Sequence, residues 1–475
     1  MNHPKLALLS SEEIHQVHES SVYLLEKCGM AIPNKEVLEI LDPHAEVDFT
    51  TQICKFPRAL VEEQIKKAPS EIRLEARNPK HTVKLTKGGD PRFFPNLGAK
   101  HVNDLETRER RVARLSDQAD FNKVIDSLEY THAGGGDIVH PSDVPSHLAQ
   151  YYSWVTAFKN TSKHMWLYLP DAPGVRLAVE IGAILSDSEE KFLAAPIASF
   201  ITCPPEVLCF ETSELRGLVE AFRYRIPVFI ESGPAAGATG PATLAGTLVL
   251  SNAELLGEIT ISQILSPGTP VVFMGFARHF DMKAENLTHG SPEFIMMRIC
   301  QGQMGNYYNL PSYGSGLTAD SKILDVQAGY DKAVGLISVL AGHQVVGSDA
   351  LDTGDIADLA ELVVNDELAA AYTRVWRGFK FDKESLAVDE IARVGPGAGH
   401  NFMGSRHTIM NFRKESWLTY RITERRKWEV WQKDGAKTAE QRAVQRAKEI
   451  LRTHRPDELP KDVAKDLDDL LASVK

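Results

Sequence analysis

The pattern of apolar and polar positions is most regular between residues 226 and 342. Three short runs of β-branched and aromatic residues, at 227–231, 270–276 and 306–313, each end in a stretch rich in Gly, Pro, Ser or aromatic residues. Longer segments with apolar residues at helical spacing follow these runs. This region therefore predicts short strands, each followed by a loop and a long helix.

The helices between these strands have recognisable ends. One helix after Thr239 extends to the break at Pro267-Gly268, and a second begins at Pro292. A third covers residues 321–341 and ends at Gly342, a residue type that often terminates helices. Short strands that alternate with long helices are typical of a parallel sheet built of βα units.

Five further strand candidates extend this sheet. They lie at 93–96, 129–138, 164–170, 196–205 and 343–347. About eight strands in alternation with helices predict an α/β fold of the (β/α)₈ barrel type. A doubly wound open sheet needs the same alternation and is the alternative architecture.

We expect three regions along the chain. Residues 1–90 predict an N-terminal α+β extension, with one helix and a small antiparallel β layer. Residues 91–350 predict the barrel core, and residues 351–475 predict C-terminal helices that pack on it. The first half of the stretch 395–408 is too rich in glycine for a helix, and we expect this stretch to lie against the barrel mouth.

Composition and charge narrow the function classes. The chain has 475 residues, a formal net charge of −11 and a pI near 5.8, so a surface that binds nucleic acid or an anionic membrane is a poor expectation. Its five cysteines form no C-x-x-C pair, and neither a signal peptide nor an apolar run of about 18 residues is present. We therefore expect a soluble, cytoplasmic protein.

The loops that follow the predicted strands contain the candidate site. The residues there are aromatic and acidic, and lack Lys and Arg. Ring faces attract a quaternary ammonium group, and a carboxylate balances its charge. Phe276, Tyr307, Tyr308 and Tyr313 are the candidate ring faces, and Glu231 is the candidate carboxylate. The alternative is that the aromatic residues belong to the core.

Other chemistries lack a matching motif. The glycines of the 232–240 loop match neither a dinucleotide-binding motif nor a phosphate-binding loop. The histidines show no H-x-x-x-H spacing, so we expect no bound metal. Ser232, Ser315 and Cys203 stand where a nucleophile could stand, but none lies in G-x-S-x-G. The sequence therefore assigns no catalytic residue.

Five motifs, taken in order, resemble those of a known family. They are Gly240-Pro241-Ala242-Thr243-Leu244-Ala245-Gly246, Asn252-Ala253-Glu254-Leu255-Leu256, Gly290-Ser291-Pro292-Glu293, Asp325-Val326-Gln327-Ala328-Gly329-Tyr330, and Gly395-Pro396-Gly397 with His407-Thr408. Over nearly its whole length the chain resembles the trimethylamine methyltransferase family. The resemblance implies a (β/α)₈ barrel that moves a methyl group from an amine to the cobalt of a separate corrinoid protein.

One departure from the family pattern affects the expected substrate. The archetypal members use pyrrolysine near the position of residues 313–317, where this chain has Gly314-Ser315-Gly316. The chain thus resembles the subgroup without pyrrolysine, some of whose members demethylate glycine betaine or related quaternary amines. A quaternary nitrogen leaves as a neutral amine, so no general acid is required. The enzyme's task is then to hold the N-methyl group in line with cobalt and to exclude water.

Together, the residues and the resemblance suggest roles for particular side chains. Glu231 would balance the substrate's positive charge, Ser315 would line the site, and His343, Arg406 or His407 would hold a substrate carboxylate. We also expect a homo-oligomer. Two other function classes stay open: a non-catalytic amine-binding or corrinoid-docking subunit, and an unrelated barrel lyase or hydrolase.

Overall fold

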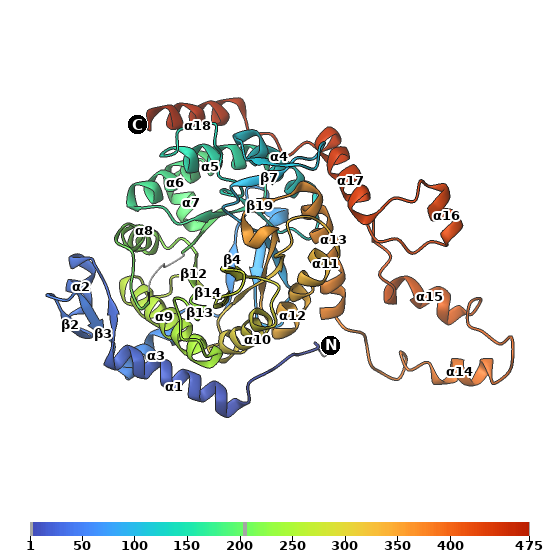
Figure 1. Cartoon of the computed structure of the whole chain (residues 1–475), viewed down its shortest axis with the longest axis horizontal. Helices are drawn as coiled ribbons and strands as arrows, with labels where there is room; N and C mark the ends of the chain where they lie inside the picture. The colour runs from blue at the N-terminus through green and yellow to red at the C-terminus, as the bar shows by residue number, and fades with distance from the viewer. Residues whose placement is uncertain (1–2, 203–206, 475) are drawn as a thin grey trace.

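The computed structural model of the protein describes residues 3–202 and 207–474. Eight parallel strands form the centre of this part of the chain. In chain order they are β6 (Arg92–Pro95), β9 (Ala133–Gly135), β10 (His164–Tyr168), β11 (Ala198–Ile201), β12 (Val228–Ser232), β14 (Val271–Gly275), β17 (Tyr313–Thr318) and β18 (Val345–Ala350). Figure 1 shows them in the middle of the molecule with helices around them. The predicted α/β class with parallel strands is confirmed.

The strands belong to two sheets rather than the single sheet that the sequence predicts. The larger sheet has the order β14-β12-β11-β10-β9, which follows the chain without the reversal typical of a doubly wound fold. The smaller sheet has the order β17-β18-β6. Single parallel bridges link the two sheets, one between Phe93 and Thr131 and one between Phe273 and Ser312.

Four aromatic rings pack between the two sheets. Phe94, Trp166, Phe229 and Tyr313 come from β6, β10, β12 and β17, and none is more than 4% exposed. Their ring centroids lie 5.7 to 6.4 Å apart, in tilted or edge-on arrangements that aromatic pairs favour. Because two of these strands belong to each sheet, this aromatic layer joins the sheets into one core.

Helices cover the outer faces of the strands. In chain order they are α4 (Leu115–Ser127), α5 (Ala149–Asn160), α6 (Ala172–Leu185), α7 (Glu189–Ala194), α8 (Thr212–Arg223), α9 (Leu244–Leu265), α10 (Pro292–Tyr307), α11 (Val326–Asp331), α12 (Val334–Ala341) and α13 (Leu359–Trp376). The helix predicted over 321–341 is present as the two shorter helices α11 and α12. Gly342 ends α12 in the left-handed conformation, as its position predicts.

One predicted strand is wrong in its position. The sequence pattern places a strand at 306–313, but residues up to Tyr307 belong to α10, and β17 begins only at Tyr313. Asn309 has a φ of 56°, a left-handed conformation that turns the chain away from the helix. The aromatic pair Tyr307 and Tyr308 therefore ends a helix rather than a strand.

The long apolar helix α9 lies in the core. By length and composition alone this helix could cross a membrane, which the sequence analysis did not expect. However, 78% of its most apolar 18-residue stretch is buried inside the protein. The N-terminal helix α1 (Ser11–Lys27), capped by Ser10 and Glu13, and α3 (Arg58–Lys67) pack against α9. The apolar character of α9 is thus explained by neighbours on several sides.

The small antiparallel layer predicted near the N-terminus is present in two parts. One is a three-stranded sheet of β1 (Met30–Ala31), β3 (Ile53–Lys55) and β2 (Glu46–Asp48), beside α2 (Lys35–Leu41). The other is the pair β4 (Ile72–Leu74) and β5 (Val83–Leu85). A further small sheet joins β7 (His101–Asn103) and β8 (Arg110–Val112) to β19 (Ile356–Ala357).

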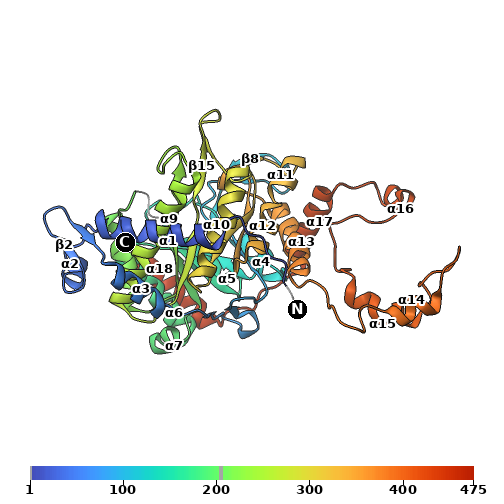
Figure 2. The same cartoon turned by 90° about the horizontal axis from the view of Figure 1, so that it is seen from below.

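The C-terminal helices divide into two groups. The helix α17 (Ala439–Thr453) packs on α13 and α4, and α18 (Lys461–Ser473) packs on α5 and α6. Between α13 and α17, the helices α14 (Val388–Val394), α15 (Arg406–Glu415) and α16 (Trp428–Lys433) project away from the rest of the protein (Figures 1 and 2). The expectation that the stretch 395–408 lies against the barrel mouth is therefore wrong for a single chain.

A buried carboxyl group after β9 makes the stability depend on pH. Asp137 accepts hydrogen bonds from Trp154 Nε1 and Tyr168 N, each 2.9 Å long. Burial raises the pKa of this carboxyl group to about 7, because the effect of burial is larger than the lowering of the pKa by these hydrogen bonds. Because the folded state holds this proton to a higher pH than the unfolded chain, the free energy of unfolding falls as the pH rises from about 4 to about 7.

We predict that Asp137→Asn stabilises the protein at pH 8 by about 1 kcal/mol or more and has little effect below pH 4, where the unfolded chain is also protonated. Denaturant unfolding at the two pH values measures the difference. Asp468→Asn, which removes an exposed carboxylate paired with Lys159, controls for the loss of one charge. Equal effects of Asp137→Asn at both pH values would contradict the assignment.

Candidate functional site

The strands β12, β14, β17 and β18 end close together at one edge of the core, which we call the carboxyl edge. Parallel strands place their carboxyl ends on one side, and ligands of α/β proteins bind there. The hairpin of β15 (Arg278–Asp281) and β16 (Asn286–Thr288) and the helix α11 follow these strands. Figure 2 shows the hairpin and α11 at the same end of the molecule.

A pair of opposite charges lies at the carboxyl edge. Glu231, on β12 and 4% exposed, has its Oε1 atom 3.9 Å from Nη2 of Arg278. The Nη2 atom is also 3.5 Å from the carbonyl oxygen of Gly233. A Cβ atom at Gly233 would lie 2.8 Å from Arg278 and 3.1 Å from Glu231, so this close approach needs glycine.

The ring of Phe276 lies close to two arginines. The guanidinium carbon of Arg278 is 4.6 Å from the ring centroid, and that of Arg298 is 5.2 Å away. Arg298 comes from α10 and is fully buried; it donates to the carbonyl oxygens of Gly275, at 3.1 Å, and of Ala277. Arg298 thus holds the segment after β14 in place. The Phe276 ring interacts with the protein's own arginine side chains through cation–π contacts.

A neutral histidine adjoins this cluster. The ring of His289 lies edge-on to Phe276 at 5.6 Å. Burial, and then the charges of Arg278 and Arg298, lower the pKa of His289 to about 3, so the imidazole is uncharged near neutral pH. Within the part of the chain that the structure describes, both ring nitrogens are buried without a hydrogen-bond partner. Both nitrogens therefore keep an unused hydrogen-bonding capacity.

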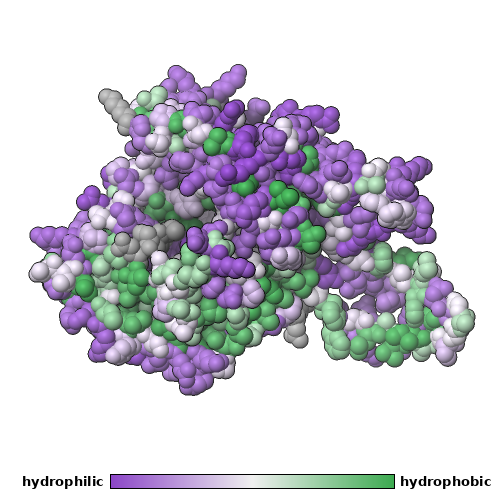
Figure 3. All heavy atoms as spheres, viewed as in Figure 1, coloured by the Kyte–Doolittle hydropathy of each residue, from purple (hydrophilic) through white to green (hydrophobic). Residues whose placement is uncertain are grey.

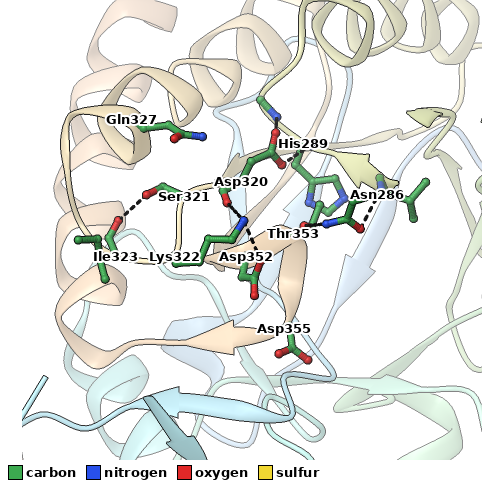
Figure 4. A network of polar contacts seen from close by, with 12 residues as sticks. Asn286, His289, Asp320, Ser321, Lys322, Ile323, Gln327, Asp352, Thr353 and Asp355 are labelled. Atoms are coloured by element: carbon green, nitrogen blue, oxygen red, sulfur yellow. Dashed lines mark hydrogen bonds and ion pairs between the residues drawn. The ribbon is translucent and has the colours of Figure 1, made fainter. Parts of the chain in front are cut away.

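Loops from three strands are tied together beside this cluster (Figure 4). Asp320, after β17, accepts from the backbone N–H groups of His289 at 2.6 Å and Gly290 at 3.0 Å. Lys322 donates to the carbonyl oxygen of Asp320 at 2.7 Å and pairs with Asp352, after β18, at 3.0 Å. These contacts fix the loops after β14, β17 and β18 relative to one another.

A buried ion pair supports the end of β17. The register against β18 shifts on either side of Leu317, and the Leu317 carbonyl oxygen accepts from Lys332 Nζ at 2.9 Å and Asn365 Nδ2 at 3.2 Å. Lys332 also pairs with Glu361, and neither side chain is more than 2% exposed. Next to this irregularity, Thr318 ends β17. Its Oγ1 is buried and, among the described residues, has no partner.

The structure assigns Tyr313 and Ser315 to the interior of β17. Tyr313 belongs to the aromatic layer of the core, as the alternative interpretation of the tyrosines holds. Ser315 is 1% exposed, and its carbonyl oxygen accepts from Ser338 Oγ at 2.8 Å. Of the two, Ser315 lies nearer the carboxyl edge.

Three other predicted site residues lie at the opposite, amino ends of the strands. Tyr308 accepts from Asn252 Nδ2 at 2.9 Å, and Tyr307 is 46% exposed beside a surface groove of about 440 Å³. His343 precedes β18 and bonds Ser312 Oγ at 3.1 Å and the Arg298 carbonyl oxygen at 2.9 Å. Tyr308 and His343 are thus held by structural contacts, Tyr307 faces the groove, and none of the three lies at the carboxyl edge.

Arg406 and His407 begin α15 in the projecting segment and do not reach the carboxyl edge of their own chain. Cys203 lies outside the described residues. Of the predicted site residues, the structure thus brings Glu231 and Phe276 together, with Ser315 on the neighbouring β17. No group of three His, Cys, Asp or Glu residues suited to a metal ion is found within residues 3–202 and 207–474.

Sequence reasoning missed Arg278, His289 and Arg298. The expectation that the carboxyl edge lacks Lys and Arg is wrong, because Arg278 follows the predicted strand end at Phe276 by only two residues. That short separation was a signal available in the sequence. Arg298 could not be found in this way, since it reaches the strand end from the middle of α10.

Comparison with known proteins agrees with this architecture. The structure of the Methanosarcina barkeri monomethylamine methyltransferase (MtmB) matches 98% of this chain and 95% of its own, with a TM-score of 0.50 at 10% sequence identity. This likeness defines the class of the fold as the mixed α/β fold of a methylamine methyltransferase.

Sequence comparison identifies the family. A family model described as "Trimethylamine methyltransferase (MTTB)" matches residues 1–475. The trimethylamine methyltransferase MttB of Desulfitobacterium hafniense is 34% identical, covering 97% of this chain and 92% of the relative. A glycine betaine methyltransferase of the same species is 31% identical, covering 97% and 95%. This chain belongs to the trimethylamine methyltransferase family, so the resemblance seen in its motifs is confirmed.

We predict that Lys332→Met destabilises the protein by about 3–5 kcal/mol, because Glu361 is left buried without its cation. Denaturant unfolding measures the loss. The matched control is Lys322→Met, which removes a 61% exposed lysine paired with Asp352 and should cost less than about 1 kcal/mol. Similar losses in the two variants would show that the buried pair does not support β17.

Proposed function

We propose that this protein is a methyltransferase that moves a methyl group from a quaternary amine, glycine betaine or a related betaine, to the Co(I) of a separate corrinoid protein. Relatives named as trimethylamine and glycine betaine methyltransferases match it over nearly its whole length. Because those relatives are named as enzymes, a non-catalytic amine-binding or docking subunit is not favoured. A quaternary substrate is supported by the resemblance to the subgroup without pyrrolysine, because this chain has Gly314-Ser315-Gly316 near the position of that residue.

The observation that carries the choice of a betaine is the Glu231–Arg278 pair. A betaine has a quaternary ammonium and a carboxylate a few bonds apart, and the pair offers the opposite charges 3.9 Å apart at the carboxyl edge. Arginine binds carboxylates through paired N–H donors, and Glu231 balances the ammonium charge. Trimethylamine and choline carry no carboxylate, so they would leave Arg278 without a ligand.

The surroundings of this pair suit methyl transfer from a charged nitrogen. The corrinoid supplies a cobalt nucleophile, and the chain's own residues bind and orient the amine and exclude water. His289, neutral near pH 7, offers a hydrogen bond without adding a charge. Arg278 beside Glu231 moderates the attraction for the ammonium, and this helps turnover because the positive charge on nitrogen decreases toward the transition state and is lost as the methyl group leaves.

An apolar rim around the carboxyl edge fits a partner that presents a corrinoid. Met282 is at the tip of the β15–β16 hairpin, Ile323 follows β17, and Val326 and Tyr330 belong to α11; each is at least 54% exposed. Exposed apolar groups at the entrance of a site mark a docking surface. We propose that the corrinoid protein docks on this rim.

We further propose that the two sheets form one closed (β/α)₈ barrel. The bridges Phe93–Thr131 and Phe273–Ser312 support closure at both junctions. The aromatic layer also supports it, because its four rings come from alternate strands of the eight, as in barrels of this type. The division at residues 90 and 350, a cytoplasmic location and a homo-oligomeric state stay predictions.

Variants of the charged pair test the substrate assignment. We predict that Arg278→Gln weakens glycine betaine binding roughly 10- to 100-fold and changes choline binding little. This loss corresponds to the about 1.5–3 kcal/mol that a hydrogen bond to a charged group contributes. Glu231→Gln should weaken the binding of both ligands, because both carry the quaternary nitrogen. Titration calorimetry on the purified protein measures the affinities.

Arg176→Gln provides the control, since Arg176 is half-exposed and pairs with Glu220 on the helical surface away from the strand ends. It should bind both ligands like the unchanged protein. Loss of choline and glycine betaine binding to the same degree in Arg278→Gln would rule out carboxylate recognition by Arg278.

A further inference from the structure

The segment 377–437, which we call the arm, leaves the body of the protein between α13 and α17. Figures 1 and 2 show α14, α15 and α16 away from all other helices. None of these three helices has a buried residue. An isolated helix of 6 to 10 residues is unstable in water, so the arm needs a surface to pack against.

Large apolar side chains are concentrated on the arm. Of the 24 exposed ones among the described residues, 13 belong to these 61 positions. They are Phe379, Phe381, Leu386, Val388, Ile391, Phe402, Met403, Ile409, Met410, Phe412, Leu418, Trp428 and Val430. Figure 3 shows apolar residues gathered over the segment of α14 and α15. A contiguous apolar surface of this kind marks a protein interface.

The base of the arm is fixed to the body. The Glu367 carboxylate on α13 accepts from the backbone N–H groups of Arg421, Ile422 and Thr423 at 2.5 to 2.6 Å, and Ile422 is only 5% exposed. Arg374 Nη2 donates to the Glu415 carbonyl oxygen at 2.9 Å. These anchors direct α14 and α15 outward from α13 and away from the carboxyl edge of their own chain (Figure 2).

The charge of the arm is opposite to that of the body. The arm has 13 Lys and Arg against 8 Asp and Glu, a formal net charge of +5, whereas the whole chain has −11. The rest of the chain therefore carries −16. Complementary charge favours association of the arm with a body of this same composition.

We propose that the arm packs on the body of a second copy of this chain. A second copy supplies the complementary charge. Because every chain carries one arm and one body, the two surfaces are always present in equal amounts. In a two-fold dimer each arm would cover the other body, so both apolar surfaces are buried at once. The corrinoid partner is a weaker candidate occupant, because it must reach the carboxyl edge, whereas α14 and α15 lie toward the opposite end of the molecule.

The oligomeric state of the full chain tests this proposal. Sedimentation velocity of the unchanged protein at micromolar concentration should give a dimer or a larger assembly of the 52.6 kDa chain. The double variant Ile409→Asp/Phe412→Asp, at positions three apart on α15, should raise the dissociation constant at least tenfold. The matched control is Tyr23→Asp/Phe49→Asp, which changes two exposed apolar residues outside the arm and should assemble normally.

A monomeric unchanged protein, or a double α15 variant that assembles like the control, would overturn the proposal. A photo-crosslinking amino acid in place of Ile409 gives a second test that leaves the arm otherwise intact. Illumination should produce a covalent product of two chains in the absence of any other protein. Crosslinking only to an added corrinoid protein would contradict the proposal. Neither test measures methyl transfer, so the outcome is independent of the proposed function.

Discussion

The packing of four aromatic rings between two parallel sheets is the constraint on which the rest of the structure depends. Phe94, Trp166, Phe229 and Tyr313 fill the space between strands that all run in one direction. Once the strands are held in this way, their carboxyl ends meet at one edge, and the helices occupy the outer faces. The polar contacts that tie the loops at that edge can then be built on a rigid support.

At the carboxyl edge the fold places charge where solvent access is low. Glu231 and Arg278 lie side by side because Gly233 leaves room for them, and Arg298 holds the segment that carries Arg278. Removing water strengthens the effect of such charges on a ligand. The opposite signs of the pair match a zwitterion better than a simple cation, which agrees with the proposed betaine substrate.

Local patterns were sufficient to predict the parallel α/β fold, most strands, the helix starts and Glu231 as a strand-end carboxylate, because strand alternation and helix caps are encoded over a few residues. Tyr307 and Tyr308 were misplaced because an aromatic run is compatible with both a strand and a helix end, and packing against α9 decides between them. The role of Arg298 and the outward course of the arm depend on contacts distant in sequence, which a single sequence does not display.

The most direct measurement is methyl transfer to a reduced Co(I) corrinoid, followed by its visible spectrum, with the purified protein and a panel of quaternary and tertiary amines. We expect methyl-cobalt formation with glycine betaine or a related betaine and none with trimethylamine. No methyl-cobalt with any quaternary amine, while the corrinoid accepts methyl groups from a chemical donor, would contradict it.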